Sequence, residues 1–223
     1  MVTKLVSRTT SNVITIAVVI AVISIGIGTG LFAGYFMANR AGALNENKST
    51  AVGRTSTYHL DLMITAASQW NSTTTAPRYY VLTPNGLESS ANISLPSHTL
   101  IQILIIDYDT PSPLPAQYAQ VSGTVGNVVY IVNGTAAASN FTNSSAIAVG
   151  SLNPNSQVSH TFTITQLGIN IPVAGNSTEI ADFYINQTGN FAWQCEDPCG
   201  FGPSGWLGPM STPGWMMGNV TVN

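Results

Sequence analysis

The chain has 223 residues, of which 7% are charged, and its formal net charge is −3. Because an average soluble domain carries about 25% charged residues, most of the surface of this protein must consist of uncharged polar groups. A nucleic-acid partner is excluded, since phosphate binding needs clusters of Lys and Arg, whereas the sequence has six such residues and Arg78 is the last of them.

Residues 13–37 (VITIAVVIAVISIGIGTGLFAGYFM) form an uncharged, apolar run of 25 residues. At 1.5 Å per residue, a helix of this length extends over about 37 Å, which is enough to cross a bilayer. A cleaved secretory signal is the alternative, but the apolar part of a signal is typically about 7–15 residues long. We therefore expect a short cytoplasmic start and a transmembrane helix at 1–37, a polar linker at 38–56 and the main domain at 57–223.

The rest of the chain is rich in Asn, Ser and Thr, and it carries nine N-x-S/T sequons. This density favours the outer side of the cell membrane, so we expect a single-pass glycoprotein with an extracytoplasmic main domain. A surface of amides and hydroxyls changes its charge little as the pH falls, which favours an acidic exterior such as that of a thermoacidophilic archaeon. The glycosylation candidates are Asn47, Asn71, Asn92, Asn133, Asn140, Asn143, Asn176, Asn186 and Asn219.

Runs of β-branched and aromatic residues, separated by Gly, Pro and Asn, predict strands throughout the main domain. Strands at this spacing are typical of a sandwich or barrel. Phe162 and Ile164 alternate with polar residues, as in a strand with one buried face. Residues 110–155 are rich in Ala, Ser and Asn, and we interpret them as a long excursion with a hairpin near 128–132. The expected strands are 58–66, 79–82, 100–107, 128–132, 160–165, 180–185, 191–194 and 219–222.

Two stretches stand out near the C-terminal end of the sequence. One is V-S-H-T-F at 158–162, and the other is G-N-F-A-W-Q-C-E-D-P-C-G at 189–200, which is followed by M-M-G-N-V-T-V at 216–222. Together they resemble the copper-binding domain of haem-copper oxidase subunit II, and 93–96 with 101–109 are similar to the opening strands of a cupredoxin. The same order occurs in archaeal sulfocyanins. The resemblance implies an all-β, cupredoxin-like Greek-key β-sandwich with one N-terminal transmembrane helix.

The resemblance also implies a copper site. Thiolates are soft ligands that suit copper, imidazole suits it as well, and a thioether adds a weak axial bond. The backbone carbonyl of Glu196 matches a further ligand, and Met210 is an alternative axial ligand. The matched side-chain ligands are His160, Cys195, Cys199 and Met216.

The sequence departs from the family at the second histidine ligand. No histidine follows His160, and we do not expect His59 or His98 to be recruited, because they belong to other predicted strands. A standard dinuclear copper centre is therefore not expected.

The residues alone leave three states open for the cysteines. Cys195 and Cys199 could form a disulfide, which an oxidising exterior permits, they could hold a modified copper site with His160 and Met216 or Met210, or they could be free thiols in a degenerate site. His160 could equally be a core histidine, and the methionines could simply fill gaps in a loop.

No catalytic residues are predicted, because the sequence shows no arrangement of nucleophile, base and orienting acid. Asp107 and Asp109 lie at strand spacing, so both carboxylates could share a face. We interpret them as a strand-end turn or a surface pair.

The sequence therefore predicts a membrane-anchored, subunit-II-like cupredoxin of an archaeal respiratory terminal oxidase. It would serve in electron transfer or, if its copper centre is degenerate, as a structural quinol-oxidase subunit. In either role it would be a non-catalytic subunit of an oxidoreductase complex, with the membrane, oxidase subunit I and other respiratory subunits as partners. The alternatives are a freestanding, sulfocyanin-like copper electron carrier and a non-catalytic surface glycoprotein that uses the cupredoxin fold.

Overall fold

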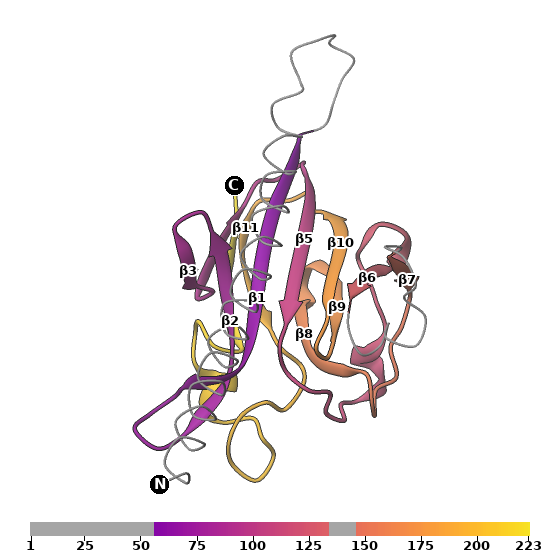
Figure 1. Ribbon diagram of the computed structural model, residues 1–223. Coiled ribbons are helices and arrows are strands. Elements are labelled where there is room, and N and C mark those ends of the chain that lie inside the picture. The colour runs from indigo at the N-terminus through magenta and orange to yellow at the C-terminus, as the bar shows by residue number, and fades with distance from the viewer. Residues whose placement is uncertain (1–55, 134–145) are drawn as a thin grey trace, which may run out of the picture. The chain divides into compact units, whose positions relative to one another are not determined.

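Figure 1 shows the computed structural model, which describes residues 56–133 and 146–223. The expected transmembrane helix and nearly all of the expected linker, together with Asn47, Asn140 and Asn143, lie outside the described residues. Within the two described ranges, no helix is both long and apolar enough to cross a membrane. Every described residue belongs to a single compact unit of the chain.

The described domain is an all-β sandwich of two sheets, which confirms that part of the predicted fold class, whereas the transmembrane helix stays a prediction (Figure 1). The first sheet has the strand order β3-β2-β1-β5-β10-β6-β7, and the second has the order β4-β12-β11-β8-β9. Two of the strand pairs, β1 with β5 and β4 with β12, are parallel. The other pairs between named strands are antiparallel.

The strands of the first sheet are β1 (Thr57–Gln69), β2 (Thr75–Thr83), β3 (Gly86–Ser89), β5 (Leu100–Asp107), β6 (Val129–Asn133), β7 (Ile147–Val149) and β10 (Thr178–Tyr184). Those of the second sheet are β4 (Asn92–Leu95), β8 (Val158–Ile164), β9 (Ile169–Ala174), β11 (Gly189–Gln194) and β12 (Met217–Val222). Short 3₁₀ helices connect some of them: η1 (Ala116–Ala119), η2 (Val125–Asn127), η3 (Thr165–Leu167) and η4 (Gly208–Ser211).

The hydrophobic core lies between the two sheets. Alternate residues in the middle of β1 and along β5 are buried in it, because side chains alternate along a strand: Leu60, Leu62, Ile64, Ile101, Ile103 and Ile105. From the second sheet, Phe162 and Trp193 are fully buried, and their rings stack with centroids 5.4 Å apart. Each buried side chain of this size stabilises the fold by about 1.5–3 kcal/mol. The packed layer gives rigid support to the ends of β8 and β11.

One expectation about β8 is wrong: its polar face is buried as well as its apolar face. Residues of the 110–155 excursion cover that face. Thr163 of β8 donates a 2.7 Å hydrogen bond to the side-chain oxygen of Asn170 on β9, and the amide nitrogen of Asn170 donates to the carbonyls of Tyr118 and Gln120 at 2.9 and 2.7 Å. Alternation of polar and apolar residues could not reveal this cover, because the covering residues come from a distant part of the chain.

Strand β9 is absent from the expected set because it contains Pro172. Proline cannot donate a hydrogen bond within a sheet, so it usually indicates a loop. Here β9 stands at the edge of its sheet, which is the position in a sheet where proline is tolerated.

Candidate metal centre

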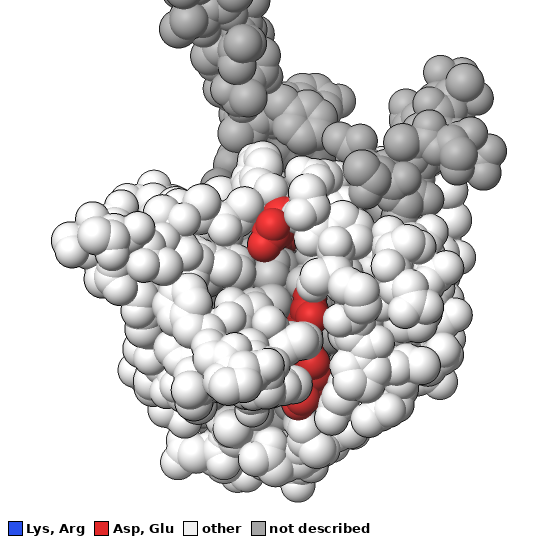
Figure 2. Space-filling view, turned by 90° about the horizontal axis from the view of Figure 1, so that it is seen from below, with Lys and Arg blue, Asp and Glu red and all other residues white. Residues whose placement is uncertain are grey.

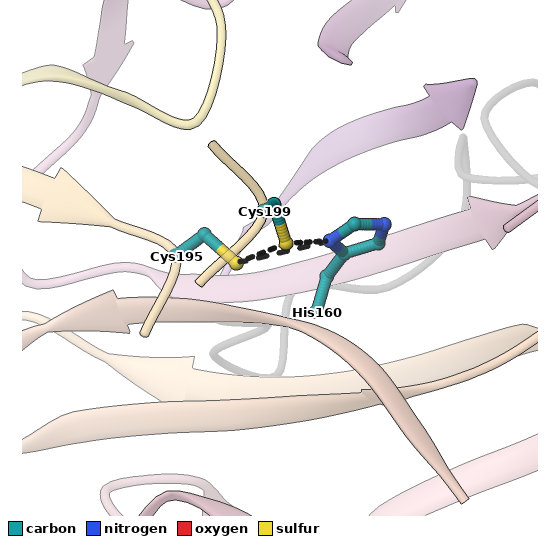
Figure 3. A group of neighbouring side chains, drawn as sticks. All are labelled: His160, Cys195 and Cys199. Atoms are coloured by element: carbon teal, nitrogen blue, oxygen red, sulfur yellow. Dashed lines mark hydrogen bonds between the residues drawn. The ribbon is translucent and has the colours of Figure 1, made fainter. Parts of the chain in front are cut away.

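Three side chains from separate parts of the sequence meet at one end of the sandwich (Figure 3). His160 lies in β8, Cys195 directly follows β11, and Cys199 lies four residues further along the chain. Nδ1 of His160 is 3.1 Å from Sγ of Cys199 and 3.8 Å from Sγ of Cys195. The two sulfur atoms are 3.9 Å apart. The structure thus brings together the imidazole and both thiols that the sequence singled out.

A β-bulge in β8 directs the His160 side chain toward the two sulfur atoms. The register of β8 against β9 shifts between Val158 and His160, and a bulge of this kind turns a side chain away from its regular direction. As a result, both Ser159 and His160 approach Asp107 on the facing sheet.

Hydrogen bonds fix Cys195 between β8 and the start of β12. Its backbone N–H donates to the carbonyl of Met216 at 2.8 Å, and its sulfur accepts from the backbone N–H of Thr161 at 3.4 Å. The next N–H along the chain, that of Glu196, donates to Oγ1 of Thr161 at 2.8 Å. Because Cys195 has no solvent exposure, its sulfur is shielded from water.

The loop after Cys199 folds tightly on itself. Phe201 and Leu207 exchange two backbone hydrogen bonds of 2.8 and 2.9 Å. Gly200 fits beneath this bridge only because it has no side chain, since a Cβ there would lie 2.1 Å from the carbonyl oxygen of Leu207 and 2.8 Å from Cγ of Met210. The loop thereby places the Met210 side chain beside Gly200, next to Cys199.

The far side of the imidazole faces two carboxylates that sequence reasoning assigned no function. Nε2 of His160 is 3.2 Å from Oδ2 of Asp109 and 4.0 Å from Oδ1 of Asp107. Asp107 is buried rather than exposed, and Ser159 donates a 2.7 Å hydrogen bond to its Oδ2. The surface-pair interpretation is therefore wrong for Asp107, whereas the strand-end position agrees with the structure: Asp107 ends β5, and the N–H of Asp109 donates to its Oδ1 at 3.1 Å. Their D-x-D spacing at a strand end was the available signal.

These contacts shift the pKa values of the cluster. Burial by itself would lower the pKa of His160, but the hydrogen bonds to Asp109 and Cys195, with the negative charges nearby, raise it to about 10. Burial would raise the pKa of Cys195, yet its hydrogen bonds to Cys199 and His160 hold it well below the usual value. Without metal, the cluster therefore contains the Cys195 thiolate beside the His160 imidazolium, and the imidazolium must lose its Nδ1 proton before that nitrogen can bind a metal ion.

A third carboxyl group lies within the cysteine loop. Asp197 has no solvent exposure; its Oδ2 accepts a hydrogen bond from Ser112, and its Oδ1 has no partner among the described residues. Burial raises the pKa of Asp197 to about 7. This residue ties the cysteine loop to the 110–155 excursion.

The remaining predicted ligands lie close by along the chain. Met216 and Met210 are both buried, and Met216 contacts Cys195 through its backbone carbonyl. Glu196 directly follows Cys195 and is half-buried. Ligation by either thioether or by the Glu196 carbonyl stays a prediction.

The other two histidines lie far from the site. His59 pairs with Gln102 on β5, five residues before Asp107, which corresponds to about 16 Å along a strand. The backbone N–H of His98 donates to the carbonyl of Ile185, just after the last residue of β10. The site lies at the other end of this strand, where the N–H of Asp107 donates to the carbonyl of Ser177. Neither can supply the second imidazole, as the sequence led us to expect.

The donor set fits a single copper ion. Ligands bound to one ion at about 2.0–2.3 Å lie about 3–4 Å from one another, and the three donor atoms are all within 4.8 Å of each other. Both cysteines are free in this structure, at a separation well beyond the about 2.05 Å of a disulfide bond. Two thiols and one imidazole form a soft set of the kind that selects copper.

The predicted glycosylation sites in the described residues lie mostly at the surface. The candidate residues that are exposed to solvent are Asn71, Asn92, Asn176, Asn186 and Asn219. Asn133 ends β6. Attachment of glycans stays a prediction.

No protein-family model matches the chain, and no curated protein matches it. Among solved structures, auracyanin B matches with a TM-score of 0.33 and 12% identity over 79% of this chain and 95% of that one. The periplasmic domain of cytochrome oxidase subunit II (CoxB) of Bradyrhizobium japonicum gives 0.31 and 12% over 74% and 83%, respectively. A heme-copper terminal oxidase dimer gives 0.31 and 12% over 90% and 96%. At TM-scores this low, these likenesses add no argument to the geometry.

Proposed function

We propose that the described domain is a cupredoxin-like electron-transfer domain that binds one copper ion through His160, Cys195 and Cys199. The observation that carries this proposal is the convergence of one imidazole nitrogen and two sulfur atoms within 4.8 Å. When bound, copper supplies one-electron exchange between its two common oxidation states.

The protein contributes a rigid, dry setting for that exchange. Tyr79, Phe162 and Trp193 form a fully buried aromatic layer beneath the site, with Tyr79 and His160 ring centroids 6.1 Å apart. The hydroxyl of Tyr79 donates to the carbonyl of Thr161 at 3.0 Å, beside the ligand-bearing residue of β8. A ligand set held by packed side chains moves little when the charge of the ion changes, which favours fast electron exchange.

The number of donors favours a mononuclear site. A dinuclear centre of the family's type needs a second histidine, and the loop from Cys199 to Met216 contains none. His59 and His98 are excluded by their distance along the strands. The three donors that meet here are enough for one ion.

At a finer level, we propose that the chain is a membrane-anchored, subunit-II-like protein of an archaeal respiratory oxidase, with oxidase subunit I as its partner. The motif resemblance over 158–222 and the apolar run at 13–37 support this role. The mononuclear donor set favours one other candidate, a freestanding, sulfocyanin-like carrier, because such a carrier needs only one copper. Co-purification of the tagged chain with haem distinguishes the two candidates.

Copper analysis of the purified full-length protein tests the proposal. We expect about one copper per chain and a thiolate-to-copper charge-transfer absorption band. Cys195→Ser and His160→Ala should each remove both signals, whereas His98→Ala, the matched control at the opposite end of the sandwich, should keep them. A folded wild-type protein that takes up no copper would reject the proposal. That result would instead agree with a structural quinol-oxidase subunit or a surface glycoprotein.

A further inference from the structure

Acidic side chains gather at the proposed metal site, although charged residues are rare in the chain. Figure 2 shows acidic groups along a hollow on this end of the domain and no Lys or Arg among the described residues of that face. Four of the nine acidic residues of the chain lie beside the ligands or in contact with them: Asp107, Asp109, Glu196 and Asp197. Of these, Asp109 makes the most direct contact with a ligand.

Asp109 determines which nitrogen of the imidazole carries a proton. An ionised carboxylate can only accept a hydrogen bond, so Nε2 of His160, at 3.2 Å from Oδ2 of Asp109, must be the donor. A neutral imidazole then has its lone pair on Nδ1. That atom faces Cys195 and Cys199, so the contact with Asp109 leaves the metal-binding nitrogen free to bind.

The Asp109 carboxylate is itself held in place. Its Oδ1 accepts a 2.7 Å hydrogen bond from the N–H of Thr110, and its backbone carbonyl accepts a 2.8 Å bond from the N–H of Asn176. The N–H of Asp109 donates to Oδ1 of Asp107 at 3.1 Å, and Ser159 fixes the other oxygen of Asp107. With two carboxylates braced in this way, the imidazole ring has little freedom to rotate.

We propose that Asp109 is the positioning residue of the metal site: it fixes His160 as the Nε2–H tautomer and places a negative charge behind the ligand. This inference rests on the proposed copper-binding function. A carboxylate that orients a metal-binding histidine also makes that histidine a stronger ligand. The added negative charge stabilises Cu(II) relative to Cu(I), so Asp109 keeps the reduction potential of the site low.

Two variants separate orientation from charge. In Asp109→Asn the amide oxygen can still accept the Nε2–H bond but the charge is lost, whereas Asp109→Ala loses both. The matched control is Asp182→Asn, which makes the same change on β10, away from the ligands. The Asp182 carboxylate accepts a 3.1 Å hydrogen bond from the side chain of Gln102. The variants are made in the full-length chain.

The first readout is the His160 ring-nitrogen NMR spectrum, recorded on Cu(I)-loaded and on metal-free protein. We expect wild type, Asp109→Asn and Asp182→Asn to show a protected Nε2–H, and Asp109→Ala to lose it. The second readout is the reduction potential. Both Asp109 variants should favour Cu(I) over Cu(II) by about tenfold more than wild type, which is about 59 mV for a one-electron couple, while Asp182→Asn should not change it.

Asp109→Ala with a protected Nε2–H and an unchanged potential would overturn the inference. Its failure is distinguishable from failure of the proposed function, because the metal-free spectrum reports on the Asp109–His160 contact even in a protein that binds no copper. A metal-free wild type without the protected Nε2–H also overturns it.

Discussion

Glu179 carries a prediction about the response of stability to pH. This residue of β10 is 1% exposed, lies in the core, and neither of its carboxyl oxygens makes a hydrogen bond of ordinary geometry. Burial raises the pKa of Glu179 well above its usual value; the nearby backbone of Ala174 offsets part of this rise, and the charge of Asp107 adds to it. The folded protein therefore keeps this proton at pH values where the unfolded chain has lost it.

The sign and size of the effect follow from proton linkage. Below the unfolded-state pKa of about 4.3, the carboxyl is neutral in both states and does not affect the pH dependence. Above that value the unfolded chain releases the proton while the folded chain retains it, so stability falls by about 1.4 kcal/mol per pH unit until the folded-state pKa is reached. Each pH unit within that range therefore removes up to about 1.4 kcal/mol from a typical total of about 5–15 kcal/mol.

Glu179→Gln removes this titration. We expect the free energy of unfolding of wild type, relative to the variant, to fall as the pH rises above about 4.3, with a slope that approaches about 1.4 kcal/mol per pH unit. Urea unfolding of the metal-free, full-length protein followed by tryptophan fluorescence measures it, since all four tryptophans lie in the described domain. Glu88→Gln on the exposed strand β3 is the matched control and should run parallel to wild type. A constant difference between wild type and Glu179→Gln would refute the reasoning.

Three further outcomes follow from the packing around the site. Gly200→Ala would place a Cβ 2.1 Å from the carbonyl oxygen of Leu207, so we expect the loop to shift and copper affinity, measured by competition with a chelator, to fall by about tenfold or more. Asn170→Ala leaves a buried hydroxyl of Thr163 without its 2.7 Å acceptor and should lower the free energy of unfolding by about 1–3 kcal/mol, as urea unfolding will show. Thiol labelling of metal-free, reduced protein should modify Cys195 and Cys199 much more slowly than in urea-unfolded protein, because the fold buries the first fully and the second in part; equal rates in folded and unfolded protein would contradict the burial described above.

The strands were largely predictable because their signals are local. Runs such as 100–107 are apolar and β-branched, and their burial depends mainly on their own sequence. The edge strand β9 was not predictable, since Pro172 usually excludes a strand. The burial of both faces of β8 depends on the 110–155 excursion, in which Tyr118 and Gln120 bond to Asn170 beside Thr163, and no local pattern reveals this.

The candidate metal site could likewise be predicted only in part from the sequence. His160, Cys195 and Cys199 were recognisable because their spacing matches a family motif, and the strand order then brings them together. Asp109 was not recognisable as their neighbour, because it follows a strand of the other sheet, 51 positions before His160. Its contact arises from the packing of two sheets, together with a bulge in β8.

The most direct test of the copper site is electron paramagnetic resonance, with X-ray absorption at the copper edge, on the oxidised full-length protein. We expect the hyperfine pattern of a single copper nucleus and scattering from both sulfur and imidazole nitrogen, with the sulfur contribution reduced in Cys199→Ser to that of Cys195 alone. Copper without sulfur scattering, or a spectrum shared between two copper nuclei, would contradict a mononuclear site built from His160, Cys195 and Cys199.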